Sequence, residues 1–164
     1  MNIKVKYFNT IYSKQPLRYT GDWVDVRACA GVKILNSERK WELADHIPYG
    51  DYCTVQLHKG NLVKIPLGFA MELPAGYEAI LEVRSSTSKN TGLIKATSGV
   101  IDEGYCGDDD QWFFVGYATR DELLYLNERI AQFRIQKKQP PLEFETVEKL
   151  GNKDRGGHGS TGRF

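Results

Sequence analysis

The chain has 164 residues, 41% of them hydrophobic, and its 22 Lys and Arg residues against 21 Asp and Glu residues give a net charge of +1. This length suits one domain that can bury a core without disulfides. The near-zero charge excludes a bulk attraction to nucleic acid or to an anionic membrane. No apolar run approaches the roughly 20 residues of a membrane span, the N-terminus lacks the apolar stretch of a secretory signal, and the three cysteines and three histidines show no metal-ligand spacing. We therefore expect a cytoplasmic protein without a structural zinc site.

Short strands dominate the predicted secondary structure. Apolar and polar residues alternate over residues 3–7, 24–30 and 77–83, which is the period of a half-buried strand. Residues 73–76 predict a hairpin turn between two strands. Residues 111–119, aromatic and nearly free of charge, predict a strand buried on both faces, and residues 121–126 fit a helix, a turn or a strand. This pattern predicts an all-β sandwich, jelly roll or barrel.

The C-terminal residues 150–164 differ from the β domain predicted over residues 1–149. The 14 residues after Leu150 include five glycines and have no hydrophobic period, so we expect a tail that is mobile in the empty protein. Its cations, hydroxyls and exposed amides also suit a flap that closes over phosphate. A solvated tail without function is the alternative.

Three segments carry chemistry. Arg84 and the hydroxyls and lysine that follow it, directly after an apolar strand, suit a polyphosphate, or else form an ordinary polar loop. Asp102, before a Gly-Tyr-x-Gly reversal, could polarise a water, or could cap its own turn. The acidic run 108–110 favours a solvated turn over a metal site. In residues 128–135, alternation places Arg129 with Ala131 and Phe133 and places Gln132 with Ile130 and Arg134. A buried Arg129 would need a carboxylate such as Asp25.

The order of five segments along the chain resembles the five motifs of the trimeric deoxyuridine triphosphatases (dUTPases), in wording nearest to their phage and Gram-positive branch. The segments are Val24-Asp25-Val26-Arg27-Ala28, Arg84-Ser85-Ser86, Gly99-Val100-Ile101-Asp102-x-x-Tyr105-x-Gly107, Arg129-Ile130-Ala131-Gln132 and Gly157-His158-Gly159-Ser160-Thr161-Gly162.

This resemblance implies a jelly-roll (β-clip-like) subunit and a homotrimer whose active sites lie between subunits, closed by the flexible tail. It implies hydrolysis of dUTP to dUMP and pyrophosphate, which limits uracil in DNA and supplies dUMP for dTMP synthesis. Mg²⁺ would be held by the triphosphate and water, near Asp25 and without direct protein ligands. Asp102 would activate the attacking water, and Tyr105 would pack on the deoxyribose. The implied base-binding residues are Thr97, Ser98, Gly99 and Val100, the implied phosphate-binding residues are Arg84, Ser85, Ser86 and Gln132, and the implied tail residues are Lys153, Arg155, His158, Gly159, Ser160 and Thr161.

Some positions depart from the family pattern. Gly104 stands in place of a second aspartate, Ala96 in place of an asparagine that contacts uracil, and His158 in place of a stacking phenylalanine. The tail cation that reaches the γ-phosphate falls on either Lys153 or Arg155. The segment of residues 36–52 makes the connection between the first two motifs longer than it needs to be. We interpret this segment as an inserted loop, an extra hairpin or a partner-binding surface.

Two other functions fit the same fold. A dCTP deaminase shares the Arg-Ser-Ser and Ile-Asp-x-Gly-Tyr wording, but it needs a glutamate shortly after that hairpin, where this sequence has Asp108-Asp109-Asp110-Gln111. A regulatory protein whose partner binding responds to nucleotide is the other alternative, and residues 36–52 would be its contact surface.

Overall fold

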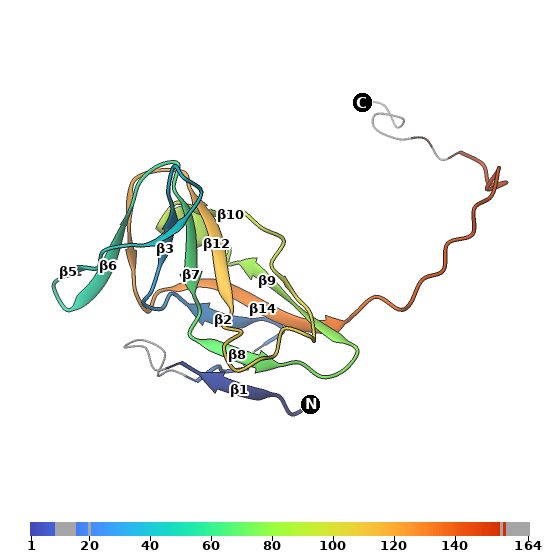
Figure 1. Cartoon of the computed structure of the whole chain (residues 1–164), viewed down its shortest axis with the longest axis horizontal. Helices are drawn as coiled ribbons and strands as arrows, with labels where there is room; N and C mark the ends of the chain where they lie inside the picture. Colours follow the sequence, from blue (N-terminus) through green and yellow to red (C-terminus); the bar gives the residue numbers. More distant parts are fainter. Residues whose placement is uncertain (9–15, 20, 155, 157–164) are drawn as a thin grey trace.

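The structure is a computed structural model in which residues 1–8, 16–19, 21–154 and 156 are described. In these residues fourteen strands and one short helix follow one another along the chain (Figure 1). The elements are β1 (Lys4–Tyr7), β2 (Val24–Arg27), β3 (Lys33–Leu35), β4 (Trp41–Leu43), β5 (Ile47–Tyr49), β6 (Tyr52–Leu57), β7 (Leu62–Pro66), β8 (Phe69–Glu72), β9 (Tyr77–Val83), α1 (Thr87–Thr91), β10 (Leu93–Lys95), β11 (Val100–Ile101), β12 (Phe113–Ala118), β13 (Glu122–Tyr125) and β14 (Arg129–Lys137).

The strands form antiparallel sheets whose order differs from the chain order. The larger sheets have the orders β10-β12-β7-β3-β4 and β11-β9-β14-β2, and the smaller ones β13-β6-β5 and β1-β8. Neighbours in the chain often belong to different sheets, as in a jelly roll. The predicted all-β class is confirmed, because α1 is the only helix among the described residues.

Aromatic rings join the sheets at the centre of the core. The Trp112 ring lies 5.0 Å from that of Phe69 on β8 and 5.2 Å from that of Phe133 on β14, centroid to centroid. All three side chains are buried. Burial of such large apolar surfaces is the main favourable contribution to the stability of the fold.

The hairpin predicted at residues 73–76 is wrong. A tight turn does form there, with the amide of Tyr77 donating to the carbonyl of Pro74 at 3.1 Å. The strands on either side of it do not pair: β8 pairs with β1, and β9 pairs with β11 and β14. The turn carries the chain from one sheet to another, and local turn chemistry does not encode that choice of partner.

Two predicted burial patterns also need correction. In β12, Phe114, Gly116 and Ala118 are buried whereas Tyr117 is exposed, so this strand is buried on one face only. In β14, a register shift between Arg129 and Ala131 forms a bulge, and both Ile130 and Ala131 are buried. The predicted alternation therefore fails at Arg129 and Ile130. Arg129 shares a face with Gln132 and not with Ala131, because the bulge adds one residue and shifts the alternation by one position.

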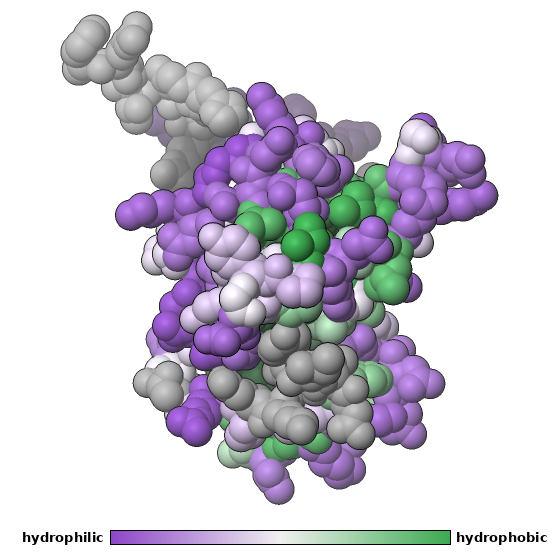
Figure 2. All heavy atoms as spheres, turned by 90° about the vertical axis from the view of Figure 1, so that its left-hand side faces the viewer, coloured by the Kyte–Doolittle hydropathy of each residue, from purple (hydrophilic) through white to green (hydrophobic). Residues whose placement is uncertain are grey.

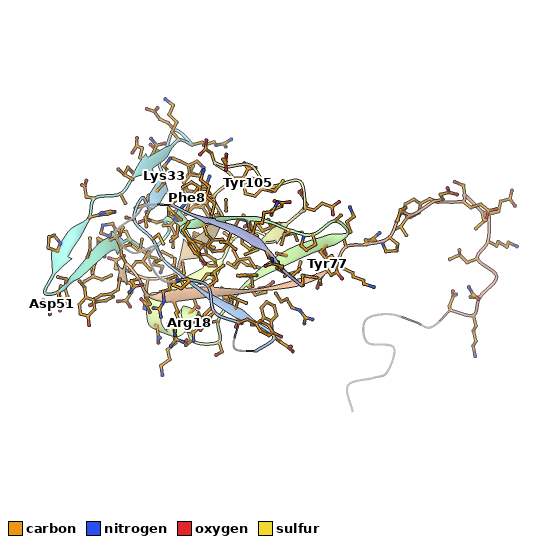
Figure 3. All side chains as sticks on the ribbon, turned by 90° about the horizontal axis from the view of Figure 1, so that it is seen from below. Phe8, Arg18, Lys33, Asp51, Tyr77 and Tyr105 are labelled. Atoms are coloured by element: carbon orange, nitrogen blue, oxygen red, sulfur yellow. The ribbon has the colours of Figure 1, made fainter. Side chains whose placement is uncertain are left out.

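Residues 36–52 form a hairpin and a further strand. β3 pairs with β4 across a turn closed by Asn36 and Lys40, and β5 pairs with β6. Figure 2 views the molecule from this side and shows apolar atoms exposed between hydrophilic ones. In Figure 3, Asp51 and Tyr77 lie at opposite ends of the folded body.

The chain leaves the folded body after β14. Residues 137–154 are all exposed, including the apolar side chains of Leu142, Phe144 and Leu150 (Figure 1). Phe144 is 90% exposed, so this arm buries little of its apolar surface against its own chain. Within the described part of the chain, no helix is long and apolar enough to cross a membrane.

Candidate functional site

Four polar side chains share one face where β2 and β14 pair. Gln132 is opposite Asp25, and Arg129 is opposite Arg27. Two residues lie between Arg129 and Gln132 on β14, but only one lies between Arg27 and Asp25 on β2. The bulge at Ile130 absorbs this difference and keeps all four side chains on the same side of the sheet.

Three guanidinium groups surround the Asp25 carboxylate. Its Oδ1 accepts a hydrogen bond from Arg84 Nε at 2.8 Å, and its Oδ2 accepts one from Arg129 Nη1 at 3.0 Å. The predicted Arg129–Asp25 pair is therefore present, although the Arg129 side chain is half exposed. Arg27 donates to the carbonyl of Asn127 at 2.6 Å, and its burial and the charge of Arg129 lower its pKa. The excess of positive charge suits phosphate oxygens.

The Arg84-Ser85-Ser86 segment is anchored by the residue that follows it. Thr87 begins α1, so the predicted loop is in part a short helix. The buried Thr87 hydroxyl donates to the carbonyl of Ile130 at 2.8 Å and accepts from the amide of Arg84 at 3.1 Å. Ser85 is exposed, and the Ser86 hydroxyl does not cap the helix. The Ser86 hydroxyl lies 3.5 Å from Arg84 Nη1, and Ser85 belongs to the same anchored segment of backbone.

Gln132 and Glu128 complete this end of the sheet. Gln132 Nε2 donates to the carbonyl of Val83 at 3.1 Å, which places its amide beside the end of β9. Burial and the neighbouring Glu122 carboxylate raise the pKa of Glu128 above 4.5. We call the set Asp25, Arg27, Arg84, Ser85, Ser86, Arg129 and Gln132 the cationic cluster.

The turn after β11 presents Asp102 beside a small pocket. Asp102 Oδ1 accepts from the amide of Gly104 at 2.8 Å, and the amide of Tyr105 donates to the Asp102 carbonyl at 3.2 Å. Asp102 therefore does cap its own turn, which leaves Oδ2 for another partner. The Tyr105 hydroxyl donates to the carbonyl of Gln111 at 3.0 Å, and burial raises the pKa of Tyr105. The pocket measures about 250 Å³ and is lined by Val100, Ile101, Asp102, Tyr105, Gln111 and Phe113.

The turn that precedes β11 exposes its backbone. Thr97 and Ser98 are exposed, and Gly99 has a left-handed φ of +67°. A Cβ on Gly99 would lie 2.5 Å from the carbonyl oxygen of Leu81, so only glycine fits this close approach. Val100 then pairs with Ile80 on β9.

The pocket and the cationic cluster lie at opposite ends of β9. Ile101 pairs with Ala79, so Asp102 lies level with the start of β9, whereas Ser85 and Ser86 follow its end. At the rise of an extended strand, Asp102 and Ser85 are about 20 Å apart. One chain therefore brings the predicted phosphate-binding residues together, but it holds them apart from Asp102.

Sequence reasoning missed Arg27 as a member of the cationic cluster. It is two residues from Asp25 on the same strand, so the period of the strand already indicated that both side chains share a face. Lys153, predicted in the tail, is exposed. The other predicted tail residues lie outside the described residues: Arg155, His158, Gly159, Ser160 and Thr161.

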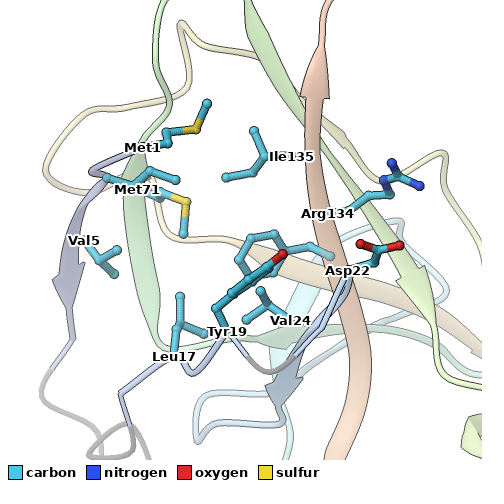
Figure 4. A pocket seen from close by; sticks show the side chains of 11 residues that line it. Met1, Val5, Leu17, Tyr19, Asp22, Val24, Met71, Arg134 and Ile135 are labelled. Atoms are coloured by element: carbon cyan, nitrogen blue, oxygen red, sulfur yellow. The ribbon is translucent and has the colours of Figure 1, made fainter.

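A larger hollow is lined by none of these residues. It measures about 670 Å³, lies beside β1, β2 and β14, and is lined mainly by apolar side chains, with Asp22 and Arg134 as its charged residues (Figure 4). Its lining does not suit a polyphosphate. The described part of the chain contains no group of three or more His, Cys, Asp or Glu residues that could hold a metal ion. The acidic run 108–110 lies in this part and forms no such group.

Comparison with known proteins points to one family. The family model for dUTPase matches residues 46–162. The chain is 45% identical over 163 residues to the SPbeta prophage-derived deoxyuridine 5'-triphosphate nucleotidohydrolase YosS of Bacillus subtilis (strain 168), covering 99% of each. It is 34% identical over 119 residues to the deoxyuridine 5'-triphosphate nucleotidohydrolase of Nocardia farcinica, covering 68% of this chain and 71% of that protein.

Solved structures agree with this at the level of the fold. A mutant of the Staphylococcus bacteriophage 80alpha dUTPase with dUpNHpp superposes with a TM-score of 0.65 at 21% identity, covering 98% of each chain. A mutant dUTPase from phage phi11 of S. aureus, described for its structural Mg(II) ion, has a TM-score of 0.61 at 18% identity, covering 92% of this chain and 99% of that chain.

Proposed function

The chain belongs to the dUTPase family, and from this premise we propose that it hydrolyses dUTP to dUMP and pyrophosphate. The observation that carries the proposal is the pairing of a cationic cluster with a pocket that contains a carboxylate and a tyrosine. The first suits a triphosphate and the second a nucleoside. The reaction limits uracil in DNA, and its product dUMP supplies dTMP synthesis.

Asp102 is the general base of the proposed reaction. Its Oδ2 accepts a proton from a water while Oδ1 stays bonded to the amide of Gly104, which fixes the carboxylate. The water oxygen forms a bond to the α-phosphorus, and the bond from that phosphorus to the bridging oxygen of the leaving pyrophosphate breaks. The Tyr105 ring, held by its hydrogen bond to the carbonyl of Gln111, packs on the deoxyribose where a 2′-hydroxyl would clash.

The cationic cluster holds the phosphates. Arg84, Ser85, Ser86 and Gln132 supply donors from a backbone that Thr87 anchors to β14. Such donors, already in position, stabilise the charge that develops on the phosphoryl oxygens. The exposed backbone of residues 97–100 reads the edge of the uracil.

The proposed site forms between copies of the chain, as in a homotrimer. The supporting observation is the distance of about 20 Å between Asp102 and Ser85, estimated from the rise per strand residue. A triphosphate cannot bridge the two groups within one chain, whereas two copies can place them face to face. The exposed apolar residues of the arm, such as Phe144, would also gain stability by packing against another copy. The tail, with Lys153, Arg155, His158 and residues 159–161, then closes over the nucleotide.

Magnesium enters this proposal with the substrate. Both carboxylate oxygens of Asp25 already accept hydrogen bonds from arginines, and the described residues offer no acidic cluster beside them. This donor set fits an ion held by the triphosphate and by water molecules, with Asp25 as the nearest carboxylate. When bound, Mg²⁺ would neutralise phosphate charge and polarise the phosphoryl oxygens.

A product assay tests the proposal and separates it from the deaminase. Purified protein is incubated with Mg²⁺ and either dUTP or dCTP, and pyrophosphate and ammonia are measured separately. Pyrophosphate from dUTP without ammonia from dCTP is the expected result. Ammonia from dCTP would assign the site to deamination, and the absence of both products would refute a catalytic role.

A further inference from the structure

Lys95 lies beneath the turn of residues 96–99 and has no role in the proposed chemistry. Its side chain is 19% exposed. Its ammonium donates to the carbonyl of Leu81 and to that of Ser98, both at 3.1 Å, and forms an ion pair with Glu82. The three protons of one ammonium thus serve two carbonyls and one carboxylate, which leaves none for a ligand.

These contacts coincide with an irregularity in the sheet. In a regular antiparallel ladder, two opposite residues in a hydrogen-bonded pair exchange both of their N–H···O bonds. Leu81 and Gly99 exchange one: the amide of Leu81 donates to the carbonyl of Gly99 at 2.8 Å. The carbonyl of Leu81 instead accepts from Lys95.

The Gly99 amide is therefore released from the ladder. Its left-handed φ of +67° turns it out of the strand geometry, and it donates to no acceptor among the described residues. Without the Lys95 ammonium, the partly buried carbonyl of Leu81 would lose its partner, at a cost that favours recapture of the Gly99 amide.

A base at this turn meets the backbone and the exposed hydroxyls of Thr97 and Ser98, whereas the methyl side chain of Ala96 offers no hydrogen bond. Among these groups, the Gly99 amide is the donor that the backbone itself holds in place. Uracil has a carbonyl at C4, where cytosine has an amino group. An N–H donor aimed at that position pairs with uracil and opposes cytosine, and such polar mismatches discriminate strongly.

We propose that Lys95 is a positioning residue for base selection: it holds the carbonyls of Leu81 and Ser98 so that the amide of Gly99 stays available to the pyrimidine. This inference rests on the proposed function and deepens it, because it names the group that fixes the base-reading turn. Glu82 balances the charge of the ammonium. Lys95 therefore acts by positioning the backbone of the turn, and not by placing a net positive charge near the pyrimidine.

The test is Lys95→Met, which keeps the length of the side chain and removes the ammonium. Lys33→Met is the matched control, because Lys33 is an exposed lysine on β3. Steady-state kinetics on dUTP and dCTP and thermal melting are measured for the wild type and both variants. In Lys95→Met we expect the KM for dUTP to rise about tenfold with kcat changed less than about threefold, and the preference in kcat/KM for dUTP over dCTP to fall about tenfold. Lys95→Arg, which keeps the charge beside Glu82, should recover part of the preference.

The outcomes distinguish this inference from the function on which it rests. A wild-type protein that releases no pyrophosphate from dUTP refutes the function. A folded, active Lys95→Met with unchanged KM and preference overturns the role of Lys95 alone. Equal losses toward both nucleotides that follow a lower melting temperature also overturn it, because they indicate a structural role only. If Lys95→Met does not fold, Glu82→Gln provides the same test: it weakens the anchor and should reduce the preference in the same direction, and an unchanged preference refutes the inference.

Discussion

Replacing Thr87 with valine should weaken the fold and loosen the phosphate-binding segment together. The Thr87 side chain is 1% exposed, and its hydroxyl bonds both the carbonyl of Ile130 and the amide of Arg84. Valine has nearly the same shape but no hydroxyl, so it leaves one acceptor and one donor without partners inside the protein. Each such group costs about 1–3 kcal/mol, and the added methyl recovers part of this loss, so we expect a destabilisation of about 2–4 kcal/mol per chain.

Urea unfolding at a fixed protein concentration measures this loss, because the stability of an assembly depends on concentration. Thr87→Ser keeps the hydroxyl and should lose only the contribution of one methyl group, about 1 kcal/mol. A Thr87→Val protein within about 0.5 kcal/mol of the wild type, a shift no larger than that of ordinary surface substitutions, would refute the anchoring role.

Three further outcomes are expected. Asp102→Asn should lower kcat by about 10²–10⁴-fold, because asparagine has the size of aspartate but cannot accept the proton of the attacking water. The affinity for a non-hydrolysable dUTP analogue, measured by calorimetry, should stay within about threefold. Truncation after Gly151 should leave the circular dichroism spectrum and the number of chains in the assembly unchanged and lower kcat/KM for dUTP; loss of the fold would contradict the separation of tail and body. Glu128→Gln should raise the urea midpoint at pH 7, because the raised pKa of Glu128 makes the wild type lose stability as pH rises through it, and the gain should vanish below pH 4.5.

Local patterns in the sequence were sufficient for isolated strands and insufficient for their pairing. The alternation over residues 77–83 corresponds to β9 without error, because a strand with one buried face determines its own period. The turn at Pro74 was also present, but the partner of β8 is β1, more than sixty residues away. A long-range choice of this kind depends on burial across the whole core. The bulge at Ile130 could not be predicted from the alternation of apolar and polar residues either, because a bulge interrupts that alternation.

The site shows the same division. Asp25, Arg84 and Gln132 could be named in advance because their motifs occur in a specific order, and the structure places them in one cluster. The distance from that cluster to Asp102 required the register of β11 on β9. The role proposed for Lys95 required three contacts made across two sheets, and no residue type or spacing in the sequence indicates them.

The separation of Asp102 from Ser85 and Ser86 by the length of β9 has a genetic consequence. A gene product without the Asp102 carboxylate still carries intact serines, and one without the two serine hydroxyls still carries an intact Asp102. If the site forms between copies, as proposed, each is inactive alone, whereas a mixed assembly combines the intact serines of one with the intact Asp102 of the other. With equal expression and random mixing, about a quarter of the interfaces receive both intact halves. Two defective alleles in one cell should therefore complement each other, whereas two alleles damaged at the same end of β9 should not.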